Sequence, residues 1–169
     1  MSKENSVLFQ QLYDQYAGMV RQMCMGYMKG NAAEADDLVQ EIFTIVWRKL
    51  ASFRGEAQYK TWIYRITVNS CLHQIRKQKK IPLRSIDTLS NEPADPGTDR
   101  RNEEQLQSLY KAIGELEEVD RLLVMLSLEG EKQEAIAEVL GLKPGTVRVR
   151  IHRLKKTLST RLKKQTNGF

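Results

Sequence analysis

Lysine and arginine, the side chains that pair with phosphate, are concentrated in two short blocks of this chain. The first block is Arg76–Lys80, and the second is residues 143–169, which hold nine Lys or Arg and no Asp or Glu. Residues 111–142 have the opposite balance, with eight acidic residues against three basic ones. Because the net charge of +6 is distributed so unevenly, the sequence predicts contact with a polyanion at two separate places.

The second basic block belongs to a segment with the spacing of a helix-turn-helix. A short helix is predicted over Gln133–Leu140, a tight turn over 141–143, and a second helix from Pro144, where a proline is tolerated best. Gly141 can adopt the positive φ that such a turn requires. One side of the second helix is apolar, through Val147, Ile151, Leu154, Leu158 and Leu162.

The opposite side of the second helix carries donors and one apolar side chain, which is what a helix needs to read the major groove of DNA. We expect one or two of its arginines to contact bases and the other basic side chains to contact phosphates. The residues predicted to bind duplex DNA are Lys143, Thr146, Arg148, Val149, Arg150, His152, Arg153, Lys155 and Lys156. A helical hairpin with a solvated basic face is the alternative for this segment.

A helix predicted over about residues 56–79 mixes aromatic and basic side chains. Its apolar residues form two stripes, one with Tyr59, Trp62, Ile63 and Ile66 beside Asn69, the other with Tyr64, Val68, Cys71 and Ile75. One stripe must pack in the core, so we expect the other to be partly exposed. Stacking surfaces beside phosphate-binding cations suit single-stranded or melting DNA. The cations are Lys60, Arg65, Arg76, Lys77, Lys79 and Lys80. A core helix buried on both sides is the alternative.

A further helix, predicted over about residues 32–51, has one apolar side and one polar side. The polar side carries Asp37, Gln40, Glu41 and Arg48, and Trp47 lies near its edge. Carboxylates and an amide beside an indole are typical of a surface on which a partner protein docks. A place for Trp47 in the core is the alternative.

The remaining periodicity completes an all-α chain of two small domains joined by a flexible linker. A first helix is predicted over residues 6–28, and Asn31 can cap the helix that follows. Residues 81–100 hold three of the four prolines and no helical periodicity, which is typical of a linker. We therefore expect domains over 1–80 and 102–169 and a linker over 81–101.

Several classes of function find little support in the sequence. Cys24 and Cys71 are expected to be reduced core residues, and the two histidines lie too far apart to indicate a metal site. No apolar run is long enough to insert into a membrane, and the N-terminus lacks a secretory core, so we expect a cytoplasmic protein. No cofactor or catalytic residue is predicted. For an enzyme acting on nucleic acid, Asp36 and Asp37 are weak support.

Two parts of the chain resemble the extracytoplasmic-function (ECF) sigma factors of bacterial RNA polymerase. Their region two is similar to DDLVQEIFTIVWRKL followed by SFRGEAQYKTWIYRITVNSCLHQIRKQKK. Their region four is similar to LEEVDRLLVMLSLEGEKQEAIAEVLGLKPGTVRVRIHRLKKTL. The resemblance covers nearly the whole chain outside the predicted linker. It implies a promoter-specificity subunit, with region two in 1–80 and region four in 102–169.

The resemblance also implies a role for each surface. Region two would dock on the clamp helices of the polymerase largest subunit through Asp37, Gln40, Glu41 and Trp47. It would melt the −10 element and hold a flipped base in a pocket of Phe53, Ile66 and Asn69. Region four would read the −35 element as duplex DNA and contact the polymerase flap. An anti-sigma factor is a further partner that the resemblance admits. The full set for −10 DNA is Phe53, Tyr59, Trp62, Tyr64, Arg65, Ile66, Asn69, Arg76, Lys77, Lys79 and Lys80.

A free-standing helix-turn-helix regulator that binds an operator as a dimer is the alternative function. It would bind DNA tightly without polymerase. It would not need an acidic docking face beside a basic aromatic helix in the first 80 residues.

Overall fold

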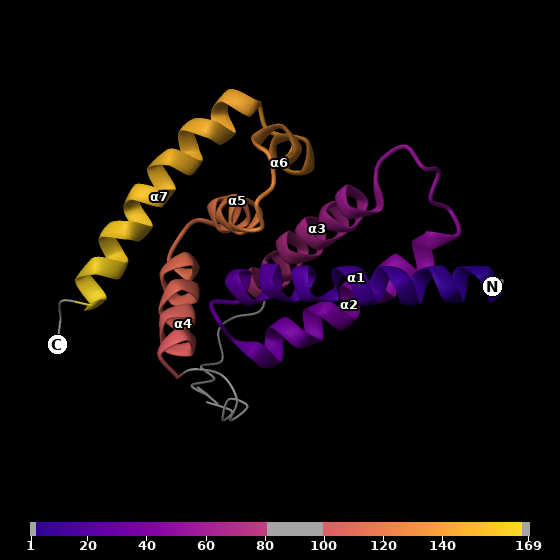
Figure 1. Cartoon of the computed structure of the whole chain (residues 1–169), viewed down its shortest axis with the longest axis horizontal. Helices are drawn as coiled ribbons and strands as arrows, with labels where there is room; N and C mark the ends of the chain where they lie inside the picture. The colour runs from indigo at the N-terminus through magenta and orange to yellow at the C-terminus, as the bar shows by residue number, and fades with distance from the viewer. Residues whose placement is uncertain (1–2, 81–99, 167–169) are drawn as a thin grey trace.

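The computed structural model describes residues 3–80 and 100–166, and within these two ranges all regular structure is α-helical. The first range contains α1 (Lys3–Tyr27), α2 (Ala32–Leu50) and α3 (Tyr59–Lys80). The second contains α4 (Arg100–Gly114), α5 (Glu118–Leu128), α6 (Gln133–Leu140) and α7 (Pro144–Thr166). We call α1–α3 the N-terminal bundle and α4–α7 the C-terminal bundle (Figure 1). The all-α prediction is confirmed.

The connection between α1 and α2 follows the predicted capping chemistry. Lys29 and Gly30 both have positive φ, which ends α1 and turns the chain. Asn31 then caps α2, because its side-chain oxygen accepts a hydrogen bond from the backbone N–H of Glu34 at 3.2 Å. The cap sets where α2 begins and therefore which of its faces is buried, through residues such as Leu38 and Ile42.

The helix-turn-helix has the predicted bounds and turn. Gly141 has a φ of 67°, and the N–H of Leu142 donates to the carbonyl of Ala137 at 2.9 Å, so the turn closes α6 in the left-handed conformation. Pro144 is the first residue of α7. The predicted apolar stripe of α7 is buried from Val147 to Leu158 and half-buried at Leu162, and the helix packs across α4, α5 and α6.

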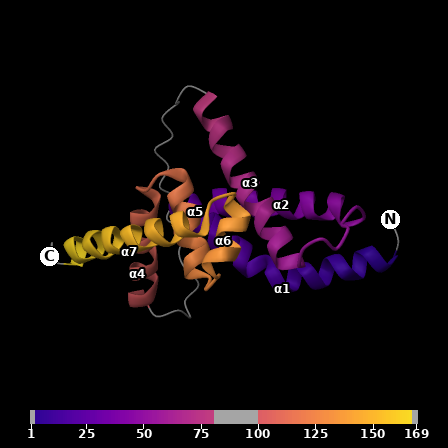
Figure 2. The ribbon, with the colours of Figure 1, turned by 90° about the horizontal axis from the view of Figure 1, so that it is seen from above.

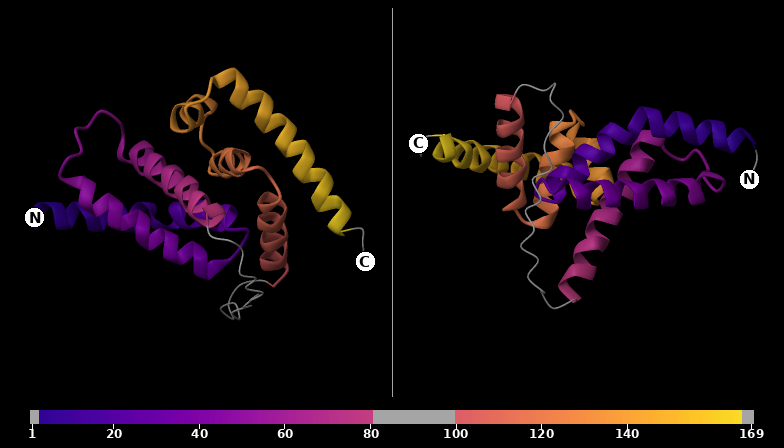
Figure 3. Two further views of the ribbon diagram at one scale, coloured as in Figure 1. Left: turned by 180° about the vertical axis from the view of Figure 1, so that it is seen from behind. Right: turned by 90° about the horizontal axis from the view of Figure 1, so that it is seen from below.

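The two bundles pack against each other, with α1 against α4 and α5 and with α3 against α6 (Figures 1 and 3). Buried residues of both bundles form one continuous apolar cluster. At the centre of the contact, Gly26 of α1 lies so close to α5 that a Cβ there would overlap the side chain of Met125. The two bundles therefore share a core, a packing that the sequence did not predict.

The two stripes of α3 differ in burial. Tyr64, Val68 and Cys71 of one stripe are buried, and so are Ile63 and Ile66 of the other, whereas Tyr59 and Trp62 at the start of that other stripe are half-buried. The alternative of a helix buried on both sides therefore holds for the middle of α3, and partial exposure holds for its start. Cys71 meets Cys24 of α1, and both thiols are free and buried, as predicted. A hydrogen bond with Cys24, together with burial, raises the pKa of the Cys71 thiol.

The structure bears only in part on the predicted linker and on the expectation about membrane-spanning segments. The predicted linker over 81–101 lies outside the described residues, except for its last two, with which α4 begins. Among the helices in the described ranges, none has the length and apolar character needed to cross a membrane.

The Asn31 cap gives a prediction about stability. Asn31→Ala leaves the N–H of Glu34 without its acceptor, so we expect the free energy of unfolding to fall by about 1 kcal/mol. Urea denaturation followed by circular dichroism measures this change. Asn31→Asp retains the acceptor and should stay near the wild type, and Asn102→Ala on the exposed face of α4 is the matched control. Equal stability of Asn31→Ala and Asn102→Ala would contradict the role of the cap.

Candidate nucleic-acid interface

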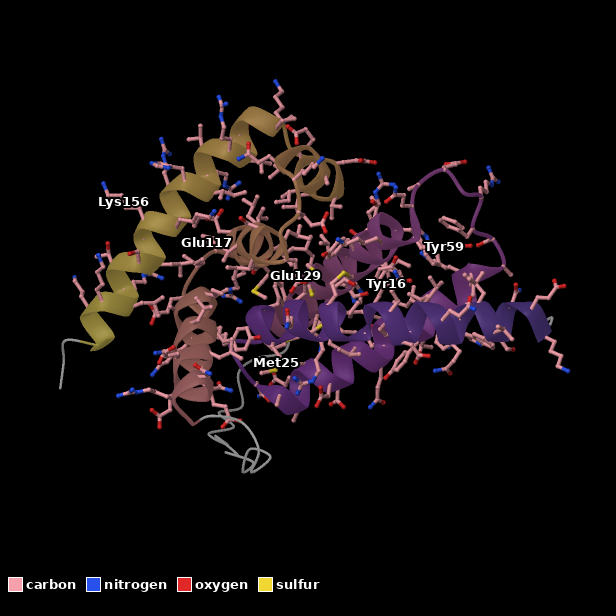
Figure 4. All side chains as sticks on the ribbon, in the orientation of Figure 1. Tyr16, Met25, Tyr59, Glu117, Glu129 and Lys156 are labelled. Atoms are coloured by element: carbon pink, nitrogen blue, oxygen red, sulfur yellow. The ribbon has the colours of Figure 1, made fainter. Side chains whose placement is uncertain are left out.

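The outward face of α7 forms a basic surface that continues into the turn before it. Val147, Ile151 and Leu154 point into the C-terminal bundle, so the residues between them point outward. Val149 is 48% exposed although it is apolar, and Figure 4 shows Lys156 directed away from the bundle. The exposed members of the predicted duplex-binding set are Lys143, Thr146, Arg148, Val149, His152, Arg153, Lys155 and Lys156.

Arg150, a half-buried member of that set, forms an ion pair within the C-terminal bundle. Its Nε donates to Oδ1 of Asp120 at 2.9 Å, and its Nη2 lies 2.6 Å from the same oxygen. Asp120 belongs to the first turn of α5, so the pair ties the recognition helix to the helix beneath it. In this geometry Arg150 positions α7, and its guanidinium is not directed outward with the others.

An aromatic cluster lies where the chain enters α3. The ring of Phe53 stacks on Tyr59 with centroids 4.5 Å apart and lies 4.9 Å from Trp62. All three rings are half-buried, so part of each ring surface faces solvent. Asn69 is exposed two turns further along α3, and Ile66 between them is buried. Flat, partly exposed rings beside an amide can stack on an unpaired base and hydrogen-bond its edge.

Three other residues predicted to meet −10 DNA face the C-terminal bundle. Lys60 forms an ion pair with Glu131, and the hydroxyl of Tyr64 donates to Oε1 of the same carboxylate at 3.3 Å. Arg65 Nη2 lies 2.5 Å from Oε1 of Glu138 in α6. Burial raises the pKa of Tyr64 well above the ordinary tyrosine value.

The basic end of α3 projects away from both bundles (Figures 2 and 3). Lys77 is exposed there. The side chains of Arg76, Lys79 and Lys80 lie outside the described residues, so the structure does not bear on their predicted phosphate contacts.

The polar face of α2 is open to solvent. Asp37, Gln40 and Glu41 are exposed, and Trp47 is half-buried with its ring edge-on to Phe9 of α1, centroids 4.9 Å apart. The sequence allowed Trp47 to be either a docking residue on the surface or a core residue, and the structure shows it partly in both. Phe9, with Tyr13 one turn further along α1, extends this surface beyond the predicted residues.

An apolar groove in the C-terminal bundle was not predicted. It has a volume of about 530 Å³ and lies between α4, α5 and α7, where Leu128 is 54% exposed. Lys155 and Lys163 border it. Its apolar lining is Leu109, Val124, Leu128, Ile151, Leu158 and Leu162. The sequence did contain a sign of this groove. Leu128 lies outside the buried residues of α5, so the C-terminal bundle has more leucines than a single buried stripe would use.

The described part of the chain has no cluster of three or more His, Cys, Asp or Glu side chains placed to hold a metal ion. Its candidate surfaces differ in character: one is basic, one aromatic, one acidic and one apolar.

Known proteins resemble this chain in sequence and in structure. Residues 12–81 match the family described as Sigma-70 region 2, and residues 106–158 match Sigma-70 region 4. The ECF RNA polymerase sigma-E factor of Haemophilus influenzae is 28% identical over 172 residues, covering 91% of this chain and 87% of that protein. The sigma-E factor of Escherichia coli is 28% identical over 174 residues, covering 96% and 90%.

A solved structure has the same arrangement of helices. The sigma factor RpoE of Bartonella quintana, in complex with the anti-sigma factor NepR, matches with a TM-score of 0.75 and 26% identity, over 92% of this chain and 96% of that one. The two family matches follow each other in the order of the two bundles, and together they include α2, α3 and the helix-turn-helix. The chain therefore belongs to the extracytoplasmic-function sigma factors of the sigma-70 family.

Proposed function

We propose that this sigma factor directs core RNA polymerase to promoters by reading the −35 element as duplex DNA and capturing the −10 element as it opens. The observation that carries the proposal is the basic outward face of α7 in the helix-turn-helix. Earlier in the same chain, residues 12–81 match Sigma-70 region 2. The division of labour is region two in 1–80, a linker in 81–101 and region four in 102–169. The protein acts in the cytoplasm, and the polymerase supplies all the catalysis.

Duplex reading falls to the outward face of α7. A helix in the major groove presents a few side chains to base edges and the rest to phosphates. Arg148 and Val149, near the start of α7, are placed to enter the groove first, and Val149 suits the methyl group of thymine. Lys155 and Lys156, two turns later, fit phosphate contacts.

Capture of the −10 element falls to the start of α3. Separating a few base pairs costs several kcal/mol, and each base stacked on an aromatic ring recovers roughly 1–3 kcal/mol. Phe53, Tyr59 and Trp62 supply such rings, and Asn69 supplies an amide that can donate and accept at a base edge. Ile66, the third predicted residue of the pocket, is buried, so it would line the pocket from the side of the core.

Docking on the polymerase uses two surfaces. The exposed carboxylates and amide of α2, with Trp47 beside them, are the contact for the clamp helices of the largest subunit. The apolar groove between α4, α5 and α7 is the contact for the flap. An anti-sigma factor, like the one bound to the Bartonella protein, would compete for the same surfaces.

Binding to core polymerase tests the whole proposal. The full-length protein should be retained by core polymerase in a pull-down, and the resulting complex should start run-off transcripts at particular sites of genomic DNA. Tight sequence-specific binding to an operator without polymerase would instead favour the free-standing dimeric regulator.

Asn69→Ala tests the −10 pocket. Loss of the amide removes a hydrogen bond to the captured base, so we expect promoter opening to fall roughly tenfold, or about 1.4 kcal/mol. Binding in the closed complex should change little. Permanganate footprinting measures unpaired thymines directly, and Asn102→Ala is the control. Equal opening by the two variants would remove Asn69 from the pocket.

Arg148→Ala tests the reading face of α7. If Arg148 contacts a base edge, the substitution should cost about 1–3 kcal/mol in promoter binding and relax the preference at one −35 position. Arg150→Ala removes the same charge but breaks the ion pair with Asp120, so it should lower the melting temperature more and promoter affinity less. Anisotropy titrations of the holoenzyme on −35 variants, with thermal unfolding, separate the two effects. The reverse order would show that Arg150 is the reading residue.

Glu41→Lys tests the docking face of α2. Reversing a charge within a complementary interface should weaken binding to core polymerase roughly tenfold and make the loss smaller at high salt. A competition titration against the unmodified protein measures the affinity. Glu104→Lys makes the same change on an exposed residue of α4 and should bind like the wild type. Equal weakening by both would point to net charge and would rule out a specific face.

A further inference from the structure

The apolar groove of the C-terminal bundle is formed where α7 lies across α4 and α5 (Figure 1). From α7 it is lined by Ile151, Leu158 and Leu162, and from α4 and α5 by Leu109 and Leu128. Ile151 and Leu158 are buried, whereas Leu128 is 54% exposed, so the lining runs from the core to the surface. The groove is therefore accessible from solvent while the two bundles stay packed.

The dimensions of the groove suit a small, long ligand. Its volume of about 530 Å³ lies within the range of about 300–1,000 Å³ that is typical of sites for small molecules. Along α7 the lining extends from Ile151 to Lys163, which is about 18 Å at about 1.5 Å per residue. A ligand that follows this length must be narrow, and an alkyl chain has that shape.

One edge of the groove carries positive charge. Lys155, Ser159 and Lys163 recur at every fourth residue of α7, which places them on one side of the helix along the groove. The lining that the structure describes includes no Asp or Glu. A lysine can lay its methylene stem along an apolar wall and hold its ammonium group in water. This edge therefore favours a ligand with an anionic head group over one with a cationic head group.

We propose that the groove binds a single-chain fatty acid anion, with the alkyl chain on the leucines of α5 and α7 and the carboxylate at the lysine edge. Exposed apolar surface such as that of Leu128 is unfavourable in water, and the alkyl chain would cover it. The ion pair at the edge stays in contact with solvent, so it orients the ligand while the chain supplies most of the affinity.

A fatty acid in the groove would exclude the polymerase flap. This consequence, unlike the binding itself, rests on the proposed function, in which the flap docks in the same groove. Because two apolar partners cannot fill one volume, a rise in free fatty acid would lower the amount of sigma factor bound to core polymerase.

Chain length tests the site on the free full-length protein. Isothermal titration calorimetry with octanoate, decanoate and dodecanoate, each below its micelle concentration, should show affinity rising roughly three- to tenfold for each two CH₂ groups added. Dodecyltrimethylammonium has the same chain as dodecanoate with the opposite charge, and it should bind roughly threefold or more weakly. Affinity that does not depend on chain length, or equal binding of the two head groups, would overturn the proposal.

A matched pair of leucine variants tests whether the chain lies in the groove. Leu128→Gln removes apolar surface from the lining and should weaken dodecanoate binding roughly three- to tenfold. Leu106→Gln changes a leucine of α4 that is 46% exposed and lies outside the lining, so it should bind like the wild type. Both leucines are exposed, so neither change disturbs the core. Equal affinities of the two variants would overturn the proposal.

A matched pair of lysine variants tests the position of the head group. Lys155→Gln with Lys163→Gln should weaken dodecanoate binding roughly three- to tenfold and leave the binding of dodecyltrimethylammonium unchanged or stronger. Lys132→Gln with Lys164→Gln removes the same charge from exposed positions of the same bundle and should bind dodecanoate like the wild type. Equal weakening in both double variants would reduce the effect to net charge and overturn the lysine edge.

A membrane is another source of alkyl chains, and vesicles distinguish it from the free acid. Sedimentation with vesicles of phosphatidylglycerol and phosphatidylcholine should be the same for the wild type and for Leu128→Gln, because the groove takes a free single chain. Vesicle binding that Leu128→Gln abolishes, without binding of dodecanoate, would overturn the proposal in favour of a membrane surface.

Retention by core polymerase separates this proposal from the proposed function. Dodecanoate at a concentration that saturates the groove should weaken retention of the wild type roughly threefold or more, and Leu128→Gln should be less sensitive to it. If dodecanoate binds the free protein and retention is unchanged, the flap does not dock in this groove, and the fatty acid site stands. If no fatty acid binds, the site proposed here is overturned, and the flap assignment is unaffected.

Discussion

The two bundles meet through apolar packing, and the close approach of α1 to α5 at Gly26 is part of it. A Cβ at this position would overlap the side chain of Met125, so a larger residue would require that flexible side chain to move within the shared apolar core. This packing aligns α3 with the turn between α5 and α6 and places Lys60 and Tyr64 over Glu131. The polar contacts across the interface therefore depend on an apolar one.

The uneven charge of the chain has a structural explanation in this packing. Residues 143–169 concentrate positive charge on the outer face of α7, while the acid-rich residues 111–142 include α5 and α6, the layer that packs between α7 and the N-terminal bundle. Asp120 of this layer pairs with Arg150 of α7, and Glu131 and Glu138 pair with α3. Acidic residues of this layer thus pair with both basic helices, α3 and α7, while Lys77 of α3 and most of the outer face of α7 stay exposed.

Local chemistry made most of the fold predictable. The cap at Asn31, the left-handed Gly141 and the proline at the start of α7 depend on neighbours in the sequence, so the bounds of α2 and of the helix-turn-helix agree with expectation. The packing of the bundles was not predictable, because nothing in the sequence around Gly26 indicates that it contacts Met125, about a hundred residues later. For the same reason the sequence could place Arg150 on a basic helix but could not reveal its partner Asp120. The apolar groove was missed because its leucines also suit a core.

Two polar groups near the contact between the bundles oppose the packed arrangement. Glu129 lies between the bundles (Figure 4), and burial raises the pKa of its carboxyl group, which means that the docked state disfavours its charged form. The hydroxyl of Tyr27 is buried without a hydrogen-bond partner among the described residues, a cost of about 1–3 kcal/mol. The free energy that holds the bundles together is therefore the gain from burying apolar surface minus these two polar costs.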